Sequence, residues 1–234
     1  LAERGVDPTR ILLLTFTNKA AREMLERAQA VAGGGVGGIW GGTFHHLANR
    51  LLRRHAARLG YTSEYPILDR DDSRQLVGDC VKQRRLQDRD FPKRDVLLSL
   101  FSARANTDVP IETLAQARFE ASSTDPADVI QIHEDYVRRK RQLGAMDFDD
   151  LLVNALALLR EHPDLAAIYR DRFLHVLVDE YQDTNTIQAE LVDRIAEGHR
   201  NLLVVGDDFQ SIYSWRGADF RHIMTFPQRY PDAC

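Results

Sequence analysis

Short apolar runs, each closed by polar residues, occur toward the two ends of the chain and predict buried strands. The clearest are residues 11–14 (Ile-Leu-Leu-Leu), 174–178 (Leu-His-Val-Leu-Val) and 202–205 (Leu-Leu-Val-Val), with a shorter run at residues 39–40. Such runs are typical of parallel strands covered on both faces. After the first run, apolar residues recur at helical spacing over residues 18–32. The pattern predicts an α/β fold with a mainly parallel sheet.

A different pattern fills residues 66–144, where apolar residues recur at helical spacing and no run predicts a strand. We therefore expect an all-helical subdomain, inserted into one α/β unit made of residues 1–65 and 145–234. The chain returns to that unit through Asp-Phe-Asp-Asp at residues 147–150. These acids suit a helix N-terminus, where the helix dipole favours negative charge.

Two clusters of basic residues stand out. Arg50, Arg53 and Arg54 fall on one face of a predicted helix, and residues 137–141 read Val-Arg-Arg-Lys-Arg. Either cluster could contact nucleic-acid phosphates. The simpler prediction, which we favour for both, is a solvated helix face.

Composition narrows the class of protein. The chain has 234 residues, of which 44% are hydrophobic and 28% charged, with a net charge of −4; these values are typical of a globular domain. Because the net charge is negative, any contact with nucleic acid must be made along a local path on the surface. Two distant cysteines predict free thiols and a cytoplasmic location. No apolar run approaches the ~18 residues of a membrane span, so we expect no membrane partner.

Two carboxylates, Asp179 and Glu180, directly follow the strand predicted at residues 174–178. Ligands of open α/β sheets bind at the carboxyl ends of the strands. Asp179 suits a Mg²⁺ ligand, with Glu180 beside it, because hard cations take oxygen ligands. Glu180 suits a general base that accepts a proton from water. On these two residues alone, a pair of solvated acids at a strand end is an equal alternative.

Three motifs, in order along the chain, carry a resemblance to a known family. They are Thr-Phe-Thr-Asn-Lys-Ala-Ala at residues 15–21, Asp-Glu-Tyr-Gln-Asp-Thr-Asn at residues 179–185, and the stretch from Val205 to Asp219. Together they resemble the first DNA-contacting motif, the Walker B motif and the third motif of the UvrD/Rep family of superfamily 1 DNA helicases. The resemblance covers nearly the whole chain. One departure is His46, where the family usually has Ser.

The resemblance implies a RecA-like fold of the P-loop NTPase type, with a helical insertion. It also implies ATP and Mg²⁺ as cofactors and 3′-to-5′ movement on single-stranded DNA, in DNA repair or replication. The implied partners are single-stranded DNA, junctions of single and double strands, and a second motor domain of the same protein.

The resemblance also assigns roles to individual residues. The catalytic residues would be Glu180, Gln210 and Arg216. Gln210 would contact the γ-phosphate, and Arg216 would couple the stacking of DNA bases to the nucleotide state. The predicted DNA-binding residues share a place in loops after strands and are Thr15, Phe16, Thr17, Asn18, Thr43, His45, Tyr213 and Trp215. The aromatic members would stack on bases and the polar members would contact phosphates.

The phosphate-binding loop of the family is not in this sequence. Residues 33–38 (Gly-Gly-Gly-Val-Gly-Gly) are rich in glycine but are not followed by Lys-Ser or Lys-Thr, so we predict a flexible loop there. We expect the chain to be a fragment of a longer protein, inactive alone. The alternatives are a DNA- or partner-binding scaffold derived from a helicase, and the helicase part of a helicase–nuclease.

Overall fold

The computed structural model describes residues 1, 5–31, 37–87, 90–207, 209 and 221–233. Its main sheet has four parallel strands in the order β2-β1-β5-β6. Their bounds are Trp40–Thr43 for β2, Ile11–Thr15 for β1, His175–Val178 for β5 and Leu202–Val204 for β6. The predicted parallel α/β architecture is confirmed. β2 begins at the predicted Trp40 but continues through two glycines to Thr43.

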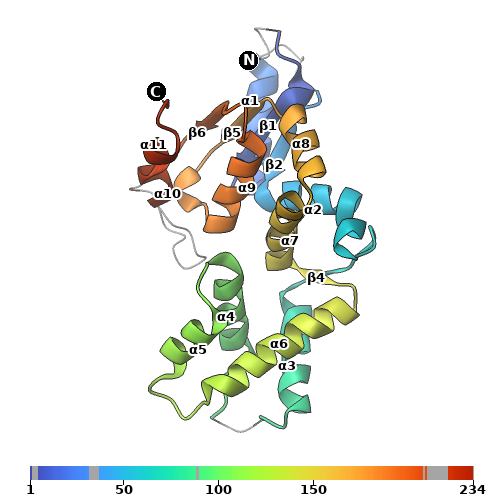
Figure 1. The fold of residues 1–234 in the computed structure, drawn as a ribbon, viewed down its shortest axis with the longest axis vertical. Coiled ribbons are helices and arrows are strands. Elements are labelled where there is room, and N and C mark those ends of the chain that lie inside the picture. Colours follow the sequence, from blue (N-terminus) through green and yellow to red (C-terminus); the bar gives the residue numbers. More distant parts are fainter. Residues whose placement is uncertain (2–4, 32–36, 88–89, 208, 210–220, 234) are drawn as a thin grey trace.

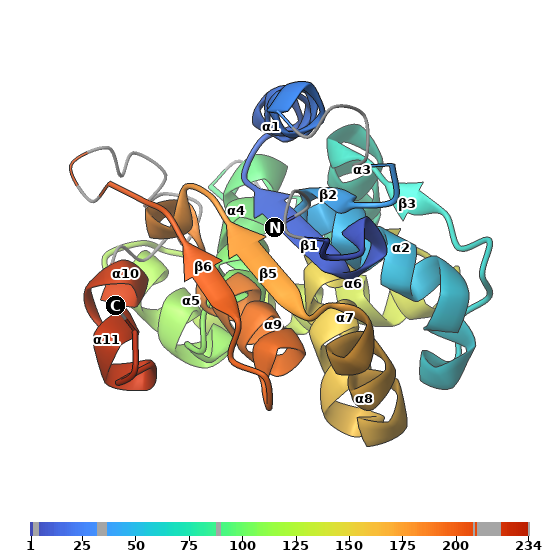
Figure 2. The same ribbon diagram turned by 90° about the horizontal axis from the view of Figure 1, so that it is seen from above.

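Helices cover the two faces of this sheet unequally, as Figure 2 shows. One face packs against four helices: α2 (Phe44–His55), α7 (Phe148–Glu161), α8 (Pro163–Arg172) and α9 (Thr186–Ala196). The other face is covered by α1 (Asn18–Val31), whose Leu25 lies so close to Gly41 that a Cβ there would approach it within 2.7 Å. Two short helices, α10 (Arg221–Met224) and α11 (Phe226–Arg229), follow β6.

Buried and less buried residues alternate along each strand, because helices cover the two faces of the sheet unequally. Leu12 and Val178 face the four helices and are almost fully buried. On the α1 side, Leu13, Leu177 and Leu203 lie side by side in register. The first two are half-buried and Leu203 is 55% exposed, because α1 packs on β1 and β2 at the other end of this row.

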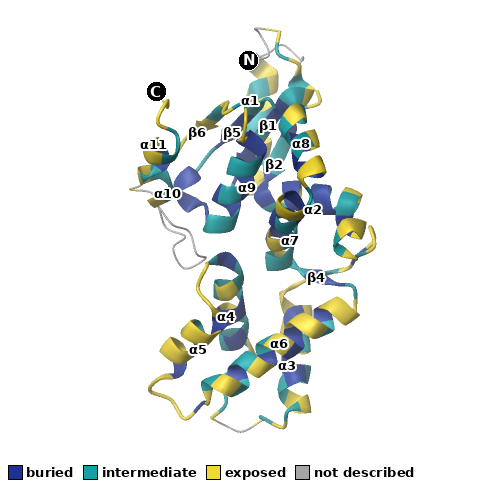
Figure 3. Cartoon of the chain, viewed as in Figure 1, coloured by how far each residue is buried: buried dark blue, intermediate teal, exposed yellow. Residues whose placement is uncertain are grey.

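Four helices between residues 70 and 142 form a separate lobe, visible below the sheet in Figure 1. They are α3 (Arg70–Gln83), α4 (Arg94–Asn106), α5 (Ile111–Phe119) and α6 (Pro126–Gln142). The lobe has its own hydrophobic core, which is separate from the core under the sheet. Figure 3 shows the buried residues on the inward faces of its helices. Cys80 is fully buried in this core, and burial raises the pKa of its thiol.

A two-stranded parallel ladder lies where the lobe joins the sheet domain. It pairs β3 (Ile67–Leu68) with β4 (Met146–Asp147). The prediction that residues 66–144 contain no strand is therefore wrong at β3. The signal was missed because two residues are too few to show alternation.

The solvated basic face predicted at residues 137–141 is present at Arg138 and Arg141, which are exposed, but is wrong at Lys140. The side chain of Lys140 is only 7% exposed and donates to Asp147 and Asp150, at 2.6 Å from each carboxylate. Tyr136 donates a further hydrogen bond to Asp147. Arg141 donates to the carbonyl of Leu59, outside the lobe. The basic residues Lys140 and Arg141 thus connect the lobe to the sheet domain. We call the group Tyr136, Lys140, Asp147 and Asp150 the neck cluster.

The acids at residues 147–150 have the structural role that was predicted for them. Asp147 caps α7, accepting from the backbone N–H of Asp150, while the Asp150 carboxylate accepts from the N–H of Asp147. This reciprocal capping box fixes where α7 begins. The same two carboxylates hold Lys140, so one pair of acids both starts α7 and anchors α6.

The arginines of α2 are likewise used within the fold. The guanidinium carbons of Arg50 and Arg54 lie 3.6 and 4.8 Å from the ring centre of Trp40. Arg53 donates to the backbone carbonyls of Ser63 and Tyr65. Cation–π and backbone contacts of this kind hold side chains in place. Arg54 is exposed, as the predicted solvated face requires, whereas Arg50 and Arg53 are half-buried by these contacts.

Replacing Lys140 with Ala should lower the free energy of unfolding by about 3–5 kcal/mol, because two carboxylates that are only 13% and 24% exposed would lose their cation. Urea unfolding followed by circular dichroism measures the change. Lys19→Ala is the control, since Lys19 is 88% exposed and its nitrogen lies 3.9 Å from Glu23. That variant should change stability by at most about 0.5 kcal/mol. Equal losses in the two variants would contradict the role given to Lys140.

Candidate functional site

The carboxyl ends of the four parallel strands meet at one edge of the sheet, which we call the carboxyl edge. Leu14 pairs with Val178 and Thr15 with Thr43. The residues that follow these strands are therefore brought together, although residues 15 and 179 are far apart in the sequence. The edge carries the acidic pair and, next to it, the turn from β1 into α1 at residues 15–18 and the junction of β2 with α2 at residues 43–45.

Asp179 and Glu180 lie directly beyond β5 and are both half-buried. The backbone N–H of Asp179 donates to the carbonyl of Leu14 at 2.9 Å, which holds the acid beside β1. Glu180 has a φ of 54°, in the left-handed region that a residue with a Cβ seldom adopts. A short 3-10 turn (Tyr181–Asp183) follows it. Such locally strained backbone is frequent where side chains must be aimed at a reaction.

Gln182 is a residue of this site that sequence reasoning missed. It is fully buried, and its amide nitrogen donates to a carboxylate oxygen of Glu180 at 2.7 Å. Its amide oxygen accepts from the backbone N–H of Asp207 at 3.0 Å, in the loop after β6. One amide thus contacts the predicted base and the neighbouring loop. The only sequence signal was its place two residues after Glu180.

Other buried groups surround the acidic pair. Asp183 is 5% exposed, one of its carboxylate oxygens has no hydrogen-bond partner among the described residues, and burial raises its pKa, with Glu180 adding to the effect. The hydroxyl of Tyr181 accepts from Arg229 at 2.7 Å, and Arg229 also pairs with Asp193. These contacts hold the turn against α9 and α11.

A magnesium ion fits the chemistry of the pair. Within the described part of the chain, no group of three or more His, Cys, Asp or Glu could hold a metal ion by itself. Mg²⁺ is usually held by one or two carboxylates together with waters and substrate phosphates. Asp179 and Glu180 supply that smaller donor set.

The predicted DNA-binding residues after β1 differ in exposure. Thr15 is fully buried, and its hydroxyl has no partner among the described residues. The assignment of Thr15 to DNA binding stays a prediction. Phe16 is half-buried, while Thr17 and Asn18 are exposed. The Thr17 hydroxyl accepts from the N–H of Ala20 at 3.1 Å, in the first turn of α1.

No loop separates β2 from α2, because the strand ends at Thr43 and the helix begins at Phe44. Thr43 is 9% exposed, and its hydroxyl accepts from the N–H of His46 at 3.2 Å, so it caps α2. His45 is half-buried, with its ring edge-on to Phe148 and 6.0 Å between ring centres. Thr43 thus has a structural role that accounts for its hydroxyl without DNA.

Four predicted site residues, Gln210, Tyr213, Trp215 and Arg216, lie outside the described residues. Most of the glycine run at residues 33–38 does so too. Their assignments stay predictions.

Comparison with known proteins agrees with this geometry. A profile of the UvrD/REP helicase N-terminal domain matches residues 1–231. The chain belongs to the UvrD/Rep helicase family. It is 39% identical over 233 residues to the ATP-dependent DNA helicase PcrA of Staphylococcus aureus, covering 100% of this chain and 31% of that protein. The PcrA of Bacillus subtilis is also 39% identical, over 235 residues, with the same coverage.

UvrD/Rep membership confirms the family that the three motifs indicated. The chain spans about a third of the length of these relatives, 31% in each case. Among the described residues, no helix combines the length and apolar character that crossing a membrane requires.

Thr43→Ala should lower the free energy of unfolding by about 1 kcal/mol, because α2 would lose its N-terminal cap. Thr43→Ser keeps the hydroxyl and should change stability little. Thermal unfolding of both variants measures the difference. If Ser were as destabilising as Ala, the hydroxyl would not be the stabilising group and the capping role would be lost.

Proposed function

We propose that this chain is the larger part of the first motor domain of an ATP-dependent DNA helicase, which moves 3′ to 5′ on single-stranded DNA in repair or replication. The observation that carries the proposal is the acidic pair at the carboxyl edge of a parallel sheet, beside the exposed Thr17 and Asn18. Family membership and the PcrA relatives, which are named as ATP-dependent DNA helicases, support it.

In this proposal residues 1–65 and 145–234 form the motor unit and residues 66–144 the inserted subdomain. The two separate hydrophobic cores support the division. A second motor domain of the intact protein would complete the ATP site. Single-stranded DNA and its junctions with duplex would be the partners.

The chemistry follows from the positions of the two acids. A water molecule attacks the γ-phosphorus, the bond to the ADP oxygen breaks, and Glu180 accepts the proton of the water. Gln182, which donates to Glu180 at 2.7 Å, holds the carboxylate in one orientation. Asp179 would hold Mg²⁺, which when bound neutralises charge on the phosphates. Gln210 would contact the γ-phosphate and Arg216 would connect the DNA side to it.

DNA would cross the same edge. Phe16, Tyr213 and Trp215 would stack on bases, which is tolerant of sequence because every base has a π-face. Thr17, Asn18 and His45 would contact phosphates or sugars. Thr43 would contribute through the position it gives to α2.

Glu180→Gln in the intact protein should abolish ATP turnover, by a factor of about 10²–10⁴, and keep ATP binding. The amide has the size of the acid and can still accept from Gln182, but it cannot take a proton. DNA-stimulated phosphate release and nucleotide affinity are the measurements. Glu190→Gln is the control, because Glu190 lies on α9 and pairs with Arg160.

Persisting hydrolysis in Glu180→Gln would remove Glu180 from the role of base. An intact parent protein that binds DNA without hydrolysing ATP would instead favour the scaffold alternative.

Trp215→Ala in the intact protein should weaken single-strand binding by about 1–3 kcal/mol, the worth of one stacked base. Fluorescence anisotropy with two unrelated oligonucleotides measures the loss, which should be similar for both sequences. Trp40→Phe is the control, since Trp40 is 4% exposed and lies under Arg50 and Arg54. Normal binding by Trp215→Ala would exclude Trp215 as a stacking residue.

A further inference from the structure

The acidic segment ends in a buried cap that reaches outside the sheet domain. Residues 181–185 are all buried, and Asn185 caps α9. Its amide oxygen accepts from the N–H of Gln188 at 2.9 Å, and the Gln188 side chain accepts from the N–H of Asn185 at 3.0 Å. This capping box fixes the point at which the segment enters α9.

The other half of the Asn185 amide contacts the helical lobe. Its nitrogen donates to the amide oxygen of Asn106, the last residue of α4, at 2.7 Å. The nitrogen of Asn106 in turn donates to Asp149 at 2.6 Å and to the carbonyl of Ser102 at 2.9 Å. Asn106 and Asn185 are 7% and 5% exposed. A chain of hydrogen bonds thus joins α9, α4 and α7.

The direction of this chain is fixed by its two ends. A backbone N–H can only donate, so the oxygen of Asn185 must face Gln188 and its nitrogen must face Asn106. The oxygen of Asn106 is then the acceptor, and its nitrogen faces a carboxylate and a carbonyl, which accept. Neither amide can flip without leaving buried polar atoms unpaired, which costs about 1–3 kcal/mol each.

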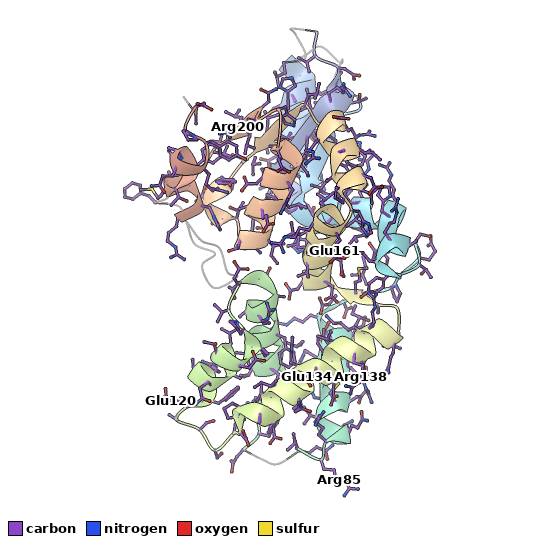
Figure 4. All side chains as sticks on the ribbon, viewed as in Figure 1. Arg85, Glu120, Glu134, Arg138, Glu161 and Arg200 are labelled. Atoms are coloured by element: carbon purple, nitrogen blue, oxygen red, sulfur yellow. The ribbon has the colours of Figure 1, made fainter. Side chains whose placement is uncertain are left out.

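A cleft lies between the two lobes, and its lining includes Asp149 of the link together with the four residues of the neck cluster. The cleft has a volume of about 1190 Å³ and is lined by α4 and α6 on one wall and by α7 and α9 on the other. Glu134 and Arg138 on α6 and Glu161 on α7, labelled in Figure 4, belong to its lining. Beside this open space, Asn106 holds the end of the acidic segment directly.

We propose that Asn106 is a positioning residue for ATP hydrolysis. Carried by the helical lobe, it holds Asn185 and so sets the position of the buried segment on which the Glu180 carboxylate depends. A movement of the lobe relative to the sheet therefore changes the position of the acidic pair. This inference rests on the proposed function, because it requires hydrolysis at that pair.

The first test uses Asn106→Asp in the intact protein. The new carboxylate has the same shape, but one oxygen would face Asp149, and like charges at hydrogen-bond distance repel. We expect kcat for DNA-stimulated ATP hydrolysis to fall about tenfold, the effect of a change near 1.4 kcal/mol in the barrier. KM for ATP should stay within about twofold of the parent, since no group near the nucleotide is altered.

The second test is rescue by Asn106→Asp combined with Asp149→Asn, which exchanges the amide and the carboxylate between the two positions. The carboxylate at position 106 would then accept from the new amide at position 149 and from Asn185. The net charge is that of the parent. The hydrogen bonds from position 106 to positions 149 and 185 are restored in a new direction, while the one to the Ser102 carbonyl is lost. We expect kcat to return to within about threefold of the parent. Rescue of this kind reports the link itself, because Asn106→Asp alone has no donor between positions 106 and 149, and the amide at position 149 supplies one.

Arg141→Ala is the matched control. It removes a different contact between the lobes, the one from Arg141 to the carbonyl of Leu59, and should lower stability without lowering kcat. All assays are run well below the unfolding temperature of each variant. A parental kcat in Asn106→Asp, or a double variant no better than the single one, overturns the positioning role. If the intact parent protein binds DNA without hydrolysing ATP, the proposed function fails instead.

Discussion

The parallel pairing of β1 with β5 is the constraint on which the rest of the structure depends. It joins Leu14 to Val178 across a stretch of chain that contains the whole helical lobe. Parallel strands need a crossover connection, and the length of that connection is not limited by the pairing itself. A complete subdomain can therefore be inserted between them. Because both strands run the same way, the loop at Thr15–Asn18 and the acids at 179–180 must share one edge.

Patterns that depend on nearest neighbours were predictable from the sequence, and those that depend on distant partners were not. The buried runs of β1, β5 and β6, the acids beyond β5 and the acidic start of α7 follow local rules of burial and capping. Lys140 could not be distinguished from its basic neighbours, since its burial comes from a fold in which α6 and α7 meet. Asn106 gave no signal and Gln182 gave only its place two residues after Glu180, because an amide looks the same whether it faces water or a buried acceptor.

Many of the arginines are used to build the fold. Arg50 and Arg54 lie over Trp40, and Arg229 holds Tyr181 and Asp193. The described candidates for DNA contact are the aromatic ring of Phe16 and hydroxyl, amide and imidazole groups, rather than Lys or Arg cations. Since the salt dependence of binding follows the number of phosphates neutralised by Lys and Arg, this edge would contribute little to it. An acidic net charge is thus compatible with a strand-binding surface that relies on stacking and neutral hydrogen bonds.

The buried thiol of Cys80 can report how often the helical lobe opens, through the rate at which it is alkylated. Only the thiolate reacts with alkylating reagents, and burial both shields this sulfur and raises its pKa. In a protein whose Cys234 has been replaced, alkylation of Cys80 would proceed no faster than the lobe transiently unfolds. The rate would therefore separate the local stability of the lobe from that of the sheet domain, without an attached probe. It would also show whether nucleotide or DNA bound at the carboxyl edge makes the lobe more rigid.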